Sequence, residues 1–559
     1  MKKTYLAALI LFAAVFAGDV WACTNLIVTR GASTDGSVMV SYAADSHQLF
    51  GALYKHIGGE HPAGEMLRIT EWDTGKYLGE IPQVERTYTT TGNMNEYGLI
   101  IGETTYGGLT ELGDPNGTMD YGSLIYITLQ RARTAREAIE VIADLADAHG
   151  YASSGESFSI ADPEEAWIME LQSKGRFGKG IVWVARRVPD GMVSAHANHA
   201  RITQFPKDDP ENCLYSEDVI SFARENGFYT GSDDDFSFSD TYAPLSFSAA
   251  RGCEARVWSF FNRVADGMDV YLDYAMGYDL TSGRMPLWVA PREKVSPKEI
   301  FDMMRDHYEG TPMDMTRDIG AGGHSLPYRW RPMEWEADAN GDGVNETYLN
   351  ERAIATQQTG FWFVGQSRDW VSPCLAGILW FGTDDAATSP LTPIYSSSTE
   401  VPWCLSIENG SMMEYSDSSM FWLTTRISNF AYLRYDMIGG EVRARIDEWE
   451  NARLAEIASI DAAAAKAHEE GHDATLAYLT DYSKRTAQWL FDKWDALDKH
   501  LLVKYMDGNV KRQNSDGTFM DNGNGANIPQ MPDFPGYDQR WRDNVAAGDD
   551  GTLRVPAEK

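Results

Sequence analysis

The sequence predicts an α+β protein. Apolar segments with the spacing of strands, separated by turn residues, recur between residues 25 and 185. Residues 122–148 have instead the three- and four-residue spacing of helices, and a second helix-rich stretch covers residues 440–505. Runs of strands followed by helices favour a layered arrangement of sheets and helices.

The first strands form two hairpins. Residues 25–29 and 38–41 are apolar, and the turn Thr34-Asp35-Gly36-Ser37 lies between them. A second hairpin-like pair brackets residues 95–98 and continues as a strand over residues 99–103. We therefore expect the N-terminal part to be built on antiparallel strands.

Later segments complete the layers. Further strands are expected at residues 157–161, 166–170 and 181–185. Over residues 440–505 the apolar positions recur at three and four, which predicts two or three helices packed against a sheet rather than a separate coiled coil. After Asp507 the composition turns to Gly, Asn, Asp and Pro, which is typical of a surface-wrapping or loose tail.

The first 22 residues have the features of an export signal. Lys2 and Lys3 precede an apolar run, and Ala22 is a small residue before a cleavage point. We expect a signal peptide over residues 1–22, one hydrolase domain with insertions over 23–506 and the tail over 507–559. No later stretch has the roughly 20 uninterrupted apolar residues of a membrane helix. The prediction is export to the periplasm or cell exterior, without an integral membrane span.

The charge excludes two classes of partner. The formal net charge is −34, whereas nucleic acids and anionic lipids require basic patches. The acidic run Asp233-Asp234-Asp235 is interpreted as a solvated loop, because like charges repel without a cation. Small peptides remain as partners, and the sequence sets no oligomeric state.

Five cysteines are present, and an odd number in an exported protein singles one out for another use. If Cys23 is that one, the other four can form two disulfides. The simplest of the three possible connectivities pairs Cys213 with Cys253 and Cys374 with Cys404. Four buried free thiols are the alternative.

Cys23 is the candidate nucleophile. Cleavage after Ala22 would make it the first residue, and its own α-amino group could then take the proton from its thiol. No Cys/His arrangement of the papain kind is present in the sequence. Two other interpretations are a buried apolar residue at a strand start and a lipid-carrying cysteine, although Trp21 is bulky for a lipoprotein signal.

Several motifs resemble those of PepD-like dipeptidases, which are N-terminal-nucleophile cysteine hydrolases. They run in family order from Cys23 to beyond residue 395: Cys23-Thr24-Asn25, Thr34-Asp35-Gly36-Ser37, Asp45-Ser46, Asn95-Glu96-Tyr97-Gly98-Leu99, Ala197-Asn198-His199, Arg256-Val257-Trp258, Gly310-Thr311-Pro312-Met313-Asp314 and Thr392-Pro393-Ile394-Tyr395. The resemblance implies the αββα sandwich of these hydrolases, with a helix-rich C-terminal part, and hydrolysis of amide bonds, most often in dipeptides.

The resemblance also assigns roles. Cys23 matches the nucleophile and Asp45 the acid that holds the N-terminal amine. Asn198 resembles the asparagine that helps to bind the oxyanion, a contribution of about 3 kcal/mol. Arg256 resembles an arginine close to the nucleophile, and Arg251 is its rival.

Two further residues are expected to contact the substrate. A third residue differs from the one that the family has at its position. Thr105 lies roughly where acylases have another oxyanion contributor, and Asn95 is placed with it on the substrate side. Tyr42 stands where the family has an arginine. A cation that could stabilise the thiolate is therefore missing from that strand, so either Arg256 takes this role alone or the substrate preference differs.

A candidate calcium loop lies further on. Asp338, Asn340 and Asp342 offer oxygen ligands at alternate positions, followed by Gly343. The twelfth position is Leu349 instead of an acid, so a plain Asx/Gly-rich turn is the alternative. Any Ca²⁺ here would be structural, because the thiol chemistry requires no cofactor.

The predicted function is that of an exported cysteine dipeptidase acting through a thioester acyl-enzyme. One alternative is an N-acyl amide hydrolase of the penicillin or bile-salt acylase type. The other is a non-catalytic exported calcium-binding protein.

Overall fold

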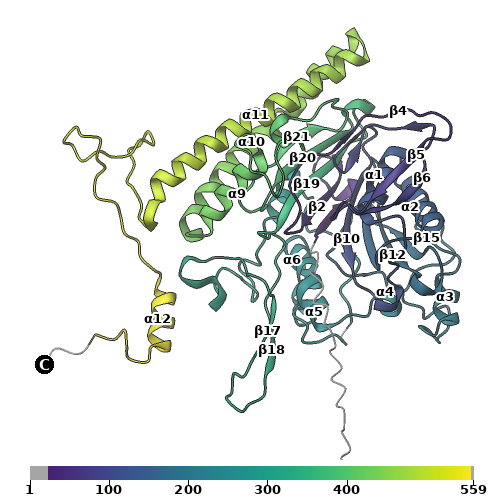
Figure 1. Cartoon of the computed structure of the whole chain (residues 1–559), viewed down its shortest axis with the longest axis horizontal. Coiled ribbons are helices and arrows are strands. Elements are labelled where there is room, and N and C mark those ends of the chain that lie inside the picture. Colours follow the sequence, from purple (N-terminus) through teal and green to yellow (C-terminus); the bar gives the residue numbers. More distant parts are fainter. Residues whose placement is uncertain (1–22, 282, 556–559) are drawn as a thin grey trace, which may run out of the picture.

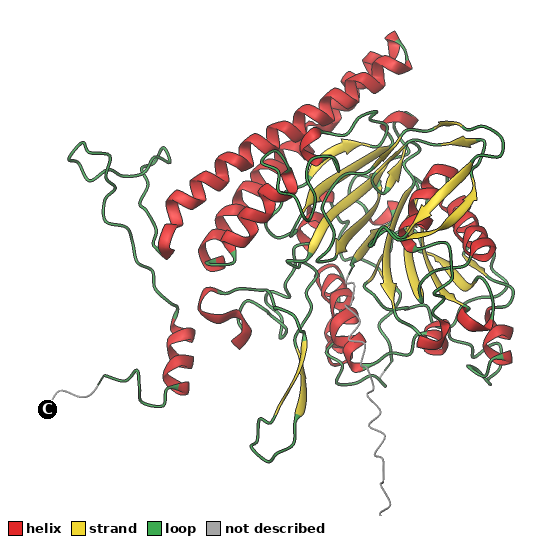
Figure 2. Cartoon of the chain, in the orientation of Figure 1, coloured by secondary structure: helices red, strands yellow, loops and turns green. Residues whose placement is uncertain are grey.

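The computed structural model describes residues 23–281 and 283–555. The predicted signal peptide, residues 1–22, lies outside the described residues. Two large antiparallel sheets pack face to face and helices cover their outer sides (Figures 1 and 2). This arrangement confirms the α+β class.

The first sheet contains the N-terminal hairpin at its centre. In the described residues it has seven strands, in the spatial order β16 (Trp288–Val289), β14 (Val193–His196), β1 (Asn25–Val28), β2 (Val38–Asp45), β19 (Thr359–Ser367), β20 (Gly377–Thr383) and β21 (Thr392–Tyr395). The pairing of Ile27 with Val40 confirms the predicted first hairpin.

The second sheet holds the middle of the chain. Its strands, again counted over the described residues, are β15 (Cys213–Tyr215), β13 (Ile181–Arg187), β12 (Ala166–Ser173), β11 (Gly155–Ala161), β10 (Ile100–Tyr106), β9 (Met94–Asn95), β8 (Thr90–Thr91) and β3 (Lys55–His56). The three strands predicted between residues 157 and 185 are present as β11, β12 and β13. Three small two-stranded ribbons lie outside both sheets: β4 (Gly59–Glu60) with β7 (Arg86–Thr87), β5 (Met66–Thr70) with β6 (Tyr77–Pro82), and β17 (Glu334–Ala337) with β18 (Glu346–Leu349).

The helices cover the two outer faces. They are α1 (Tyr121–Arg131), α2 (Ala135–His149), α3 (Val219–Glu225), α4 (Phe238–Tyr242), α5 (Phe247–Ala249), α6 (Ala255–Val264), α7 (Leu272–Ala275), α8 (Pro297–Met303), α9 (Met420–Ala431), α10 (Tyr435–Ala467), α11 (His472–Tyr505) and α12 (Gln539–Gly548). The helical spacing over residues 122–148 corresponds to two helices. The chain turns between them because Thr134 caps α2 by accepting a hydrogen bond from the Glu137 amide.

Alternation along the strands divides the core into three parts. Val40, Tyr42 and Phe363 point between the sheets, while Met39 and Trp362 point to the opposite face. That face packs against α6, α8 and the α10–α11 pair. The outer face of the second sheet packs against α1 and α2. The layer order is therefore helices, sheet, sheet, helices.

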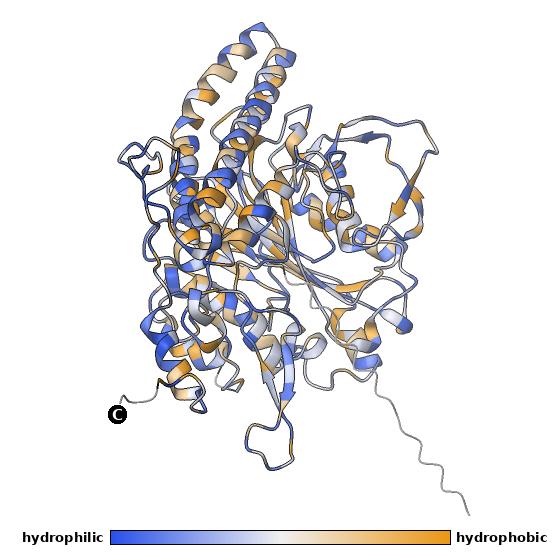
Figure 3. Cartoon of the chain, turned by 60° about the vertical axis from the view of Figure 1, so that its left-hand side comes forward, coloured by the Kyte–Doolittle hydropathy of each residue, from blue (hydrophilic) through white to orange (hydrophobic). Residues whose placement is uncertain are grey.

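Helices α10 and α11 confirm the prediction for residues 440–505. They form a long antiparallel pair that contacts β21 and extends beyond the sheet (Figure 1). Hydrophobic and hydrophilic residues alternate along both helices (Figure 3). No helix among the described residues is both long and apolar enough to cross a bilayer.

The tail after Asp507 runs along one side of the molecule and carries α12 (Figure 1). Arg540 in α12 donates to the carbonyl oxygens of Asp318 and Gly322.

All five cysteines are free, buried thiols, so neither suggested disulfide is formed. The structure thus has the four buried free thiols that were the alternative interpretation.

Candidate active site

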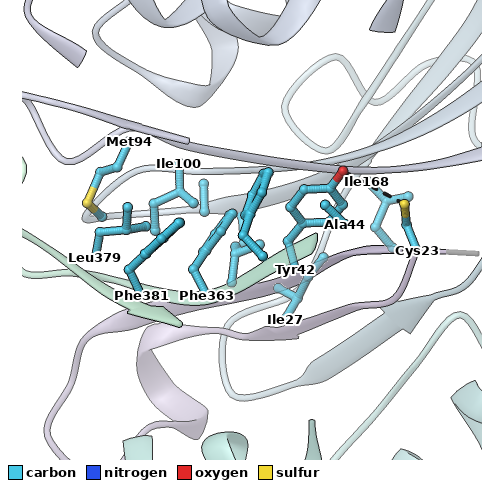
Figure 4. Close-up of a cluster of buried hydrophobic side chains, with 14 of the residues drawn as sticks. Cys23, Ile27, Tyr42, Ala44, Met94, Ile100, Ile168, Phe363, Leu379 and Phe381 are labelled. Atoms are coloured by element: carbon cyan, nitrogen blue, oxygen red, sulfur yellow. Dashed lines mark hydrogen bonds between the residues drawn. The ribbon is translucent and has the colours of Figure 1, made fainter. Parts of the chain in front are cut away.

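Cys23 lies at the end of the first hairpin, between the two sheets. The Ala43 amide donates to the Thr24 carbonyl oxygen at 3.1 Å, and this register places Cys23 beside the C-terminal end of β2, where Asp45 lies. Figure 4 shows Cys23 at one end of a row of apolar side chains that includes Tyr42 and Ile168. The pairing of two strands therefore brings Cys23 and Asp45 together across 22 positions of sequence.

The sulfur of Cys23 faces oxygen atoms. Its Sγ lies 3.3 Å from Oε1 of Glu103 and 3.8 Å from the Tyr42 hydroxyl, which itself donates to Glu103 at 2.5 Å. Burial raises the pKa of the Cys23 thiol well above its usual value, and the charges of Glu103 and Asp45 raise it further. The resting residue is therefore a neutral thiol that donates to Glu103.

Asp45 is buried at the end of β2. It accepts hydrogen bonds from the guanidinium group of Arg352 and, at 2.6 Å, from the Thr359 hydroxyl. Burial raises the pKa of Asp45 to about 6, while Arg352 opposes the rise. Asp45 is thus close to Cys23 and held in one orientation by two partners from distant segments.

Asn198 and Arg256 meet behind the backbone of Cys23. Arg256 donates to the Cys23 carbonyl oxygen at 2.6 Å, to the Thr24 hydroxyl at 2.8 Å and to Oδ1 of Asn198 at 2.9 Å. Its guanidinium group therefore holds the backbone of Cys23 and not its sulfur. Arg251 lies elsewhere, where it pairs with Glu351.

Asn198 adopts a left-handed backbone conformation, with φ of 61°. Nδ2 donates to the carbonyl oxygen of Thr105 at 2.8 Å, which uses one of its two hydrogens. Arg256 and Thr105 together fix the amide plane. A fixed amide donor of this kind can stabilise negative charge that develops on a substrate oxygen.

Thr105 lies at the edge of this cluster, in β10. Its hydroxyl donates to Glu156 at 2.8 Å. Glu156 is fully buried, and burial together with the charge of Glu103 raises its pKa well above the usual value. Glu156 is therefore protonated, beside Glu103.

Asn95 is not part of the cluster. Its Nδ2 donates to the carbonyl oxygens of Leu129 and Ala132, at the end of α1. Its Oδ1 accepts from the amides of Tyr97 and Leu99. The first two bonds connect the β9–β10 turn to the end of α1 and the other two close the turn, so the side chain has a structural role away from Cys23.

Three residues of the site were not predicted from the sequence: Glu103, Glu156 and Arg352. Glu103 could have been recognised, because Glu103-Thr104-Thr105 places polar residues inside a strand that is otherwise apolar. Arg352 follows no recognisable motif. His196, the histidine of the sheet beside Cys23, is bonded to Thr104 and Ser159 and is not a partner of the thiol.

The predicted calcium loop forms the tip of the exposed β17–β18 hairpin. Asp338 accepts from the amides of Asp342 and Gly343, which closes the turn. Asn340 donates to Glu346 at 3.3 Å, which links the loop to β18. Binding of Ca²⁺ to this loop stays a prediction.

A second group of acids lies between α8 and α10. Asp302, Asp447 and Glu450 converge within ligand distance of one another. Ion pairs with three cations already balance them: Lys298, Arg305 and Arg443. The group is therefore a salt-bridge network that joins the two helices.

Comparison with known proteins gives consistent results. The sequence matches the model of the family described as peptidase family C69 over residues 22–448. It is 25% identical over 335 residues to a probable dipeptidase of Salmonella dublin, covering 56% of this chain and 72% of that protein. It is 24% identical over 493 residues to a probable dipeptidase of Latilactobacillus sakei, covering 82% and 90%. Probable dipeptidase B of Streptococcus pyogenes serotype M1 is 22% identical over 464 residues, covering 79% and 84%.

Proposed function

Because the chain belongs to peptidase family C69, we propose that it is an exported cysteine dipeptidase whose nucleophile is the thiol of Cys23. The observation that carries the proposal is the convergence of Asp45, Asn198 and Arg256 on Cys23 from three separate segments. The order of layers supports assignment to the N-terminal-nucleophile type.

The proposed base is the α-amino group of Cys23. In the 559-residue chain this nitrogen belongs to a peptide bond, so it becomes basic only after cleavage following Ala22. The neutral, buried thiol then transfers its proton to the amine as the sulfur attacks the carbonyl carbon of the peptide bond. Asp45 orients the amine and tunes its proton affinity.

The tetrahedral oxyanion is stabilised by Nδ2 of Asn198 and by backbone N–H groups. When the C–N bond breaks, the Cys23 ammonium returns its proton to the leaving amine, and a thioester remains on the sulfur. Water then attacks the thioester while the amine takes one of its protons. Breaking the C–S bond releases the acid and restores the thiol.

Arg256 and Tyr42 support this geometry. Arg256 fixes the carbonyl group of Cys23 and the amide of Asn198, so both groups keep their positions during attack. Tyr42, in the place of the family arginine, donates to Glu103 and contributes no positive charge to the thiolate. The proposed reaction uses no metal or cofactor, since nucleophile and base belong to one residue.

The decisive experiment is replacement of Cys23 in the processed protein. Cys23→Ala should abolish dipeptide hydrolysis and leave the melting temperature nearly unchanged, because alanine removes only the reacting sulfur. Cys23→Ser should retain weak activity, since an alcohol is much harder to deprotonate. Turnover close to wild type in Cys23→Ala would disprove the mechanism.

Mass spectrometry of the mature N-terminus tests export processing separately. A free Cys23 is expected. A lipidated N-terminus, or one that begins elsewhere, would remove the proposed base and favour a non-catalytic surface or calcium-binding protein.

A substrate panel tests the alternative acylase function. Free dipeptides should be cleaved, whereas penicillins and conjugated bile acids should not. The reverse preference would assign the protein to the N-acyl amide hydrolases, a result that the absence of the family arginine at Tyr42 would then explain.

A further inference from the structure

The carboxylate of Glu103 has an unusual environment. It lies fully buried beside the Cys23 sulfur, and it accepts hydrogen bonds from the Cys23 thiol and the Tyr42 hydroxyl. Among the described residues, none of its recorded hydrogen-bond or ion-pair partners is a cation. A buried carboxylate without a cationic partner is costly, because hydroxyl and thiol donors replace only part of its hydration.

Two guanidinium groups of the site have other partners. Arg256 binds the backbone of Cys23 and the side chain of Asn198. Arg352 binds Asp45.

Glu156 gives a second, independent indication. Its Oε2 accepts from Thr105 and Tyr151, but its Oε1 is buried without a hydrogen-bond partner in the described structure. Glu156 interacts directly with Glu103 and retains a proton. The two carboxyl groups are thus in direct contact next to the nucleophile, and Oε1 of Glu156 has no partner outside the pair.

A partly exposed residue, Tyr121, lies near this pair. Tyr121 and Trp72 are partly exposed, and the Tyr121 hydroxyl donates to Asp73 at 2.7 Å. The charges of Asp73, Glu103 and Cys23 all act on Tyr121, so these groups are neighbours.

We propose that Glu103, supported by Glu156, binds the α-ammonium group of the first residue of the substrate and so restricts cleavage to the first peptide bond. This inference rests on the proposed function. The α-nitrogen and the carbonyl carbon of one residue are two bonds, about 2.5 Å, apart. An ammonium group bonded to Glu103 therefore places the carbonyl carbon of the same residue within reach of Sγ, which is 3.3 Å from the carboxylate.

The same contact assists catalysis. In the resting site, the negative charge of Glu103 opposes formation of a thiolate. The ammonium group of a bound substrate neutralises that charge, so deprotonation of the thiol becomes easier only when a substrate with a free amine is present. Glu103 is in this view a residue that determines specificity, and the proton still passes from the thiol to the Cys23 amine.

The test compares two substrates that differ only in the amino group, L-alanyl-L-alanine and propionyl-L-alanine. The processed wild-type protein should have a kcat/KM at least about 100-fold higher for the dipeptide, because the analogue leaves Glu103 unpaired. Glu103→Gln should reduce this preference to below about 10-fold, mainly through loss of dipeptide turnover. Glu140→Gln, on the exposed face of α2, is the matched control and should keep the wild-type preference.

Each outcome distinguishes the two proposals. A wild-type protein that cleaves both substrates equally, or a Glu103→Gln variant with an unchanged preference, overturns the role of Glu103 and leaves the dipeptidase proposal intact. An equal loss for both substrates would assign the carboxylate to the ammonium group of Cys23 instead, and also overturns the inference. A processed wild-type protein that cleaves no dipeptide overturns the proposed function itself. The wild-type comparison can overturn the inference even if Glu103→Gln fails to fold.

Discussion

At the scale of single residues, Asn198 shows how the site is held in place. Its positive φ of 61° is a conformation that asparagine tolerates better than most residues. The side chain is fixed because it donates to Thr105 and accepts from Arg256. A donor that is already oriented requires no rearrangement when charge develops on the substrate.

Replacing Asn198 tests this donor. Asn198→Gly and Asn198→Ala should each lower kcat by about 100- to 1,000-fold, with a smaller change in KM, because the amide acts mainly in the transition state. The glycine variant matches the left-handed backbone, so it separates loss of the donor from backbone strain. Steady-state kinetics with a dipeptide provide the measurement, and a glycine variant with wild-type kcat would contradict the role.

At the scale of elements, α10 is attached to the sandwich through Glu450. Its carboxylate is fully buried and pairs with Arg305, which is also buried, and it accepts from the Leu391 amide at 3.0 Å. Breaking one partner of such a pair leaves an uncompensated buried charge. The bonds of Glu450 therefore join α10 to Arg305, just after α8, and to the loop before β21.

Glu450→Ala should lower the free energy of unfolding by about 3–5 kcal/mol. Glu448→Ala is the matched control, because Glu448 lies on the same helix with its side chain 67% exposed. That change should stay within about 0.5 kcal/mol. Urea unfolding of both variants gives the comparison, and equal stabilities would show that the buried pair does not anchor α10.

The β17–β18 hairpin provides a second test at this scale. We expect Ca²⁺ to bind the Asp338 loop and to slow amide hydrogen exchange over residues 334–349, because a bound cation would tie the carboxylates of the loop together. Combined Asp338→Ala and Asp342→Ala changes should abolish the effect. Exchange rates that do not respond to Ca²⁺ or chelator would identify the loop as a plain turn.

At the scale of the whole molecule, several carboxyl groups are buried in the interior. Burial raises the pKa of Asp45 to about 6 and the pKa values of Asp73, Glu170 and Asp384 to about 7. In the unfolded chain these groups titrate near their ordinary values, around 4. Between about pH 4 and pH 7 these four carboxyl groups therefore hold more protons in the folded state than in the unfolded state.

The stability of the protein should consequently fall as the pH rises through this window. The stabilisation from proton uptake is fully present below the unfolded pKa values and is lost as the pH passes 6 to 7. The net charge of −34 at pH 7 adds repulsion in the same direction. Melting temperatures at constant ionic strength should drop by several degrees from pH 5 to pH 8, and a rise would contradict the burial of these carboxyls.

Local signals in the sequence were sufficient for much of the fold and part of the site. Strand alternation and helical spacing indicated the first hairpin, β11 to β13 and the helices at 440–505, because these patterns depend on neighbouring residues. Cys23, Asp45, Asn198 and Arg256 each lie in a recognisable short motif. The structure gathers these four residues, whereas it places Asn95 elsewhere and leaves all cysteines reduced.

Sequence alone determined the α+β class, the family resemblance, the candidate cysteine and the acidic character, since each depends on composition or on short local patterns. Only the tertiary structure decided which groups surround the sulfur. Glu103 is 80 positions from Cys23, and Arg352 is 307 positions from Asp45. No local pattern connects residues at such separations, because it is the packing of two sheets and the pairing of their strands that bring them into contact.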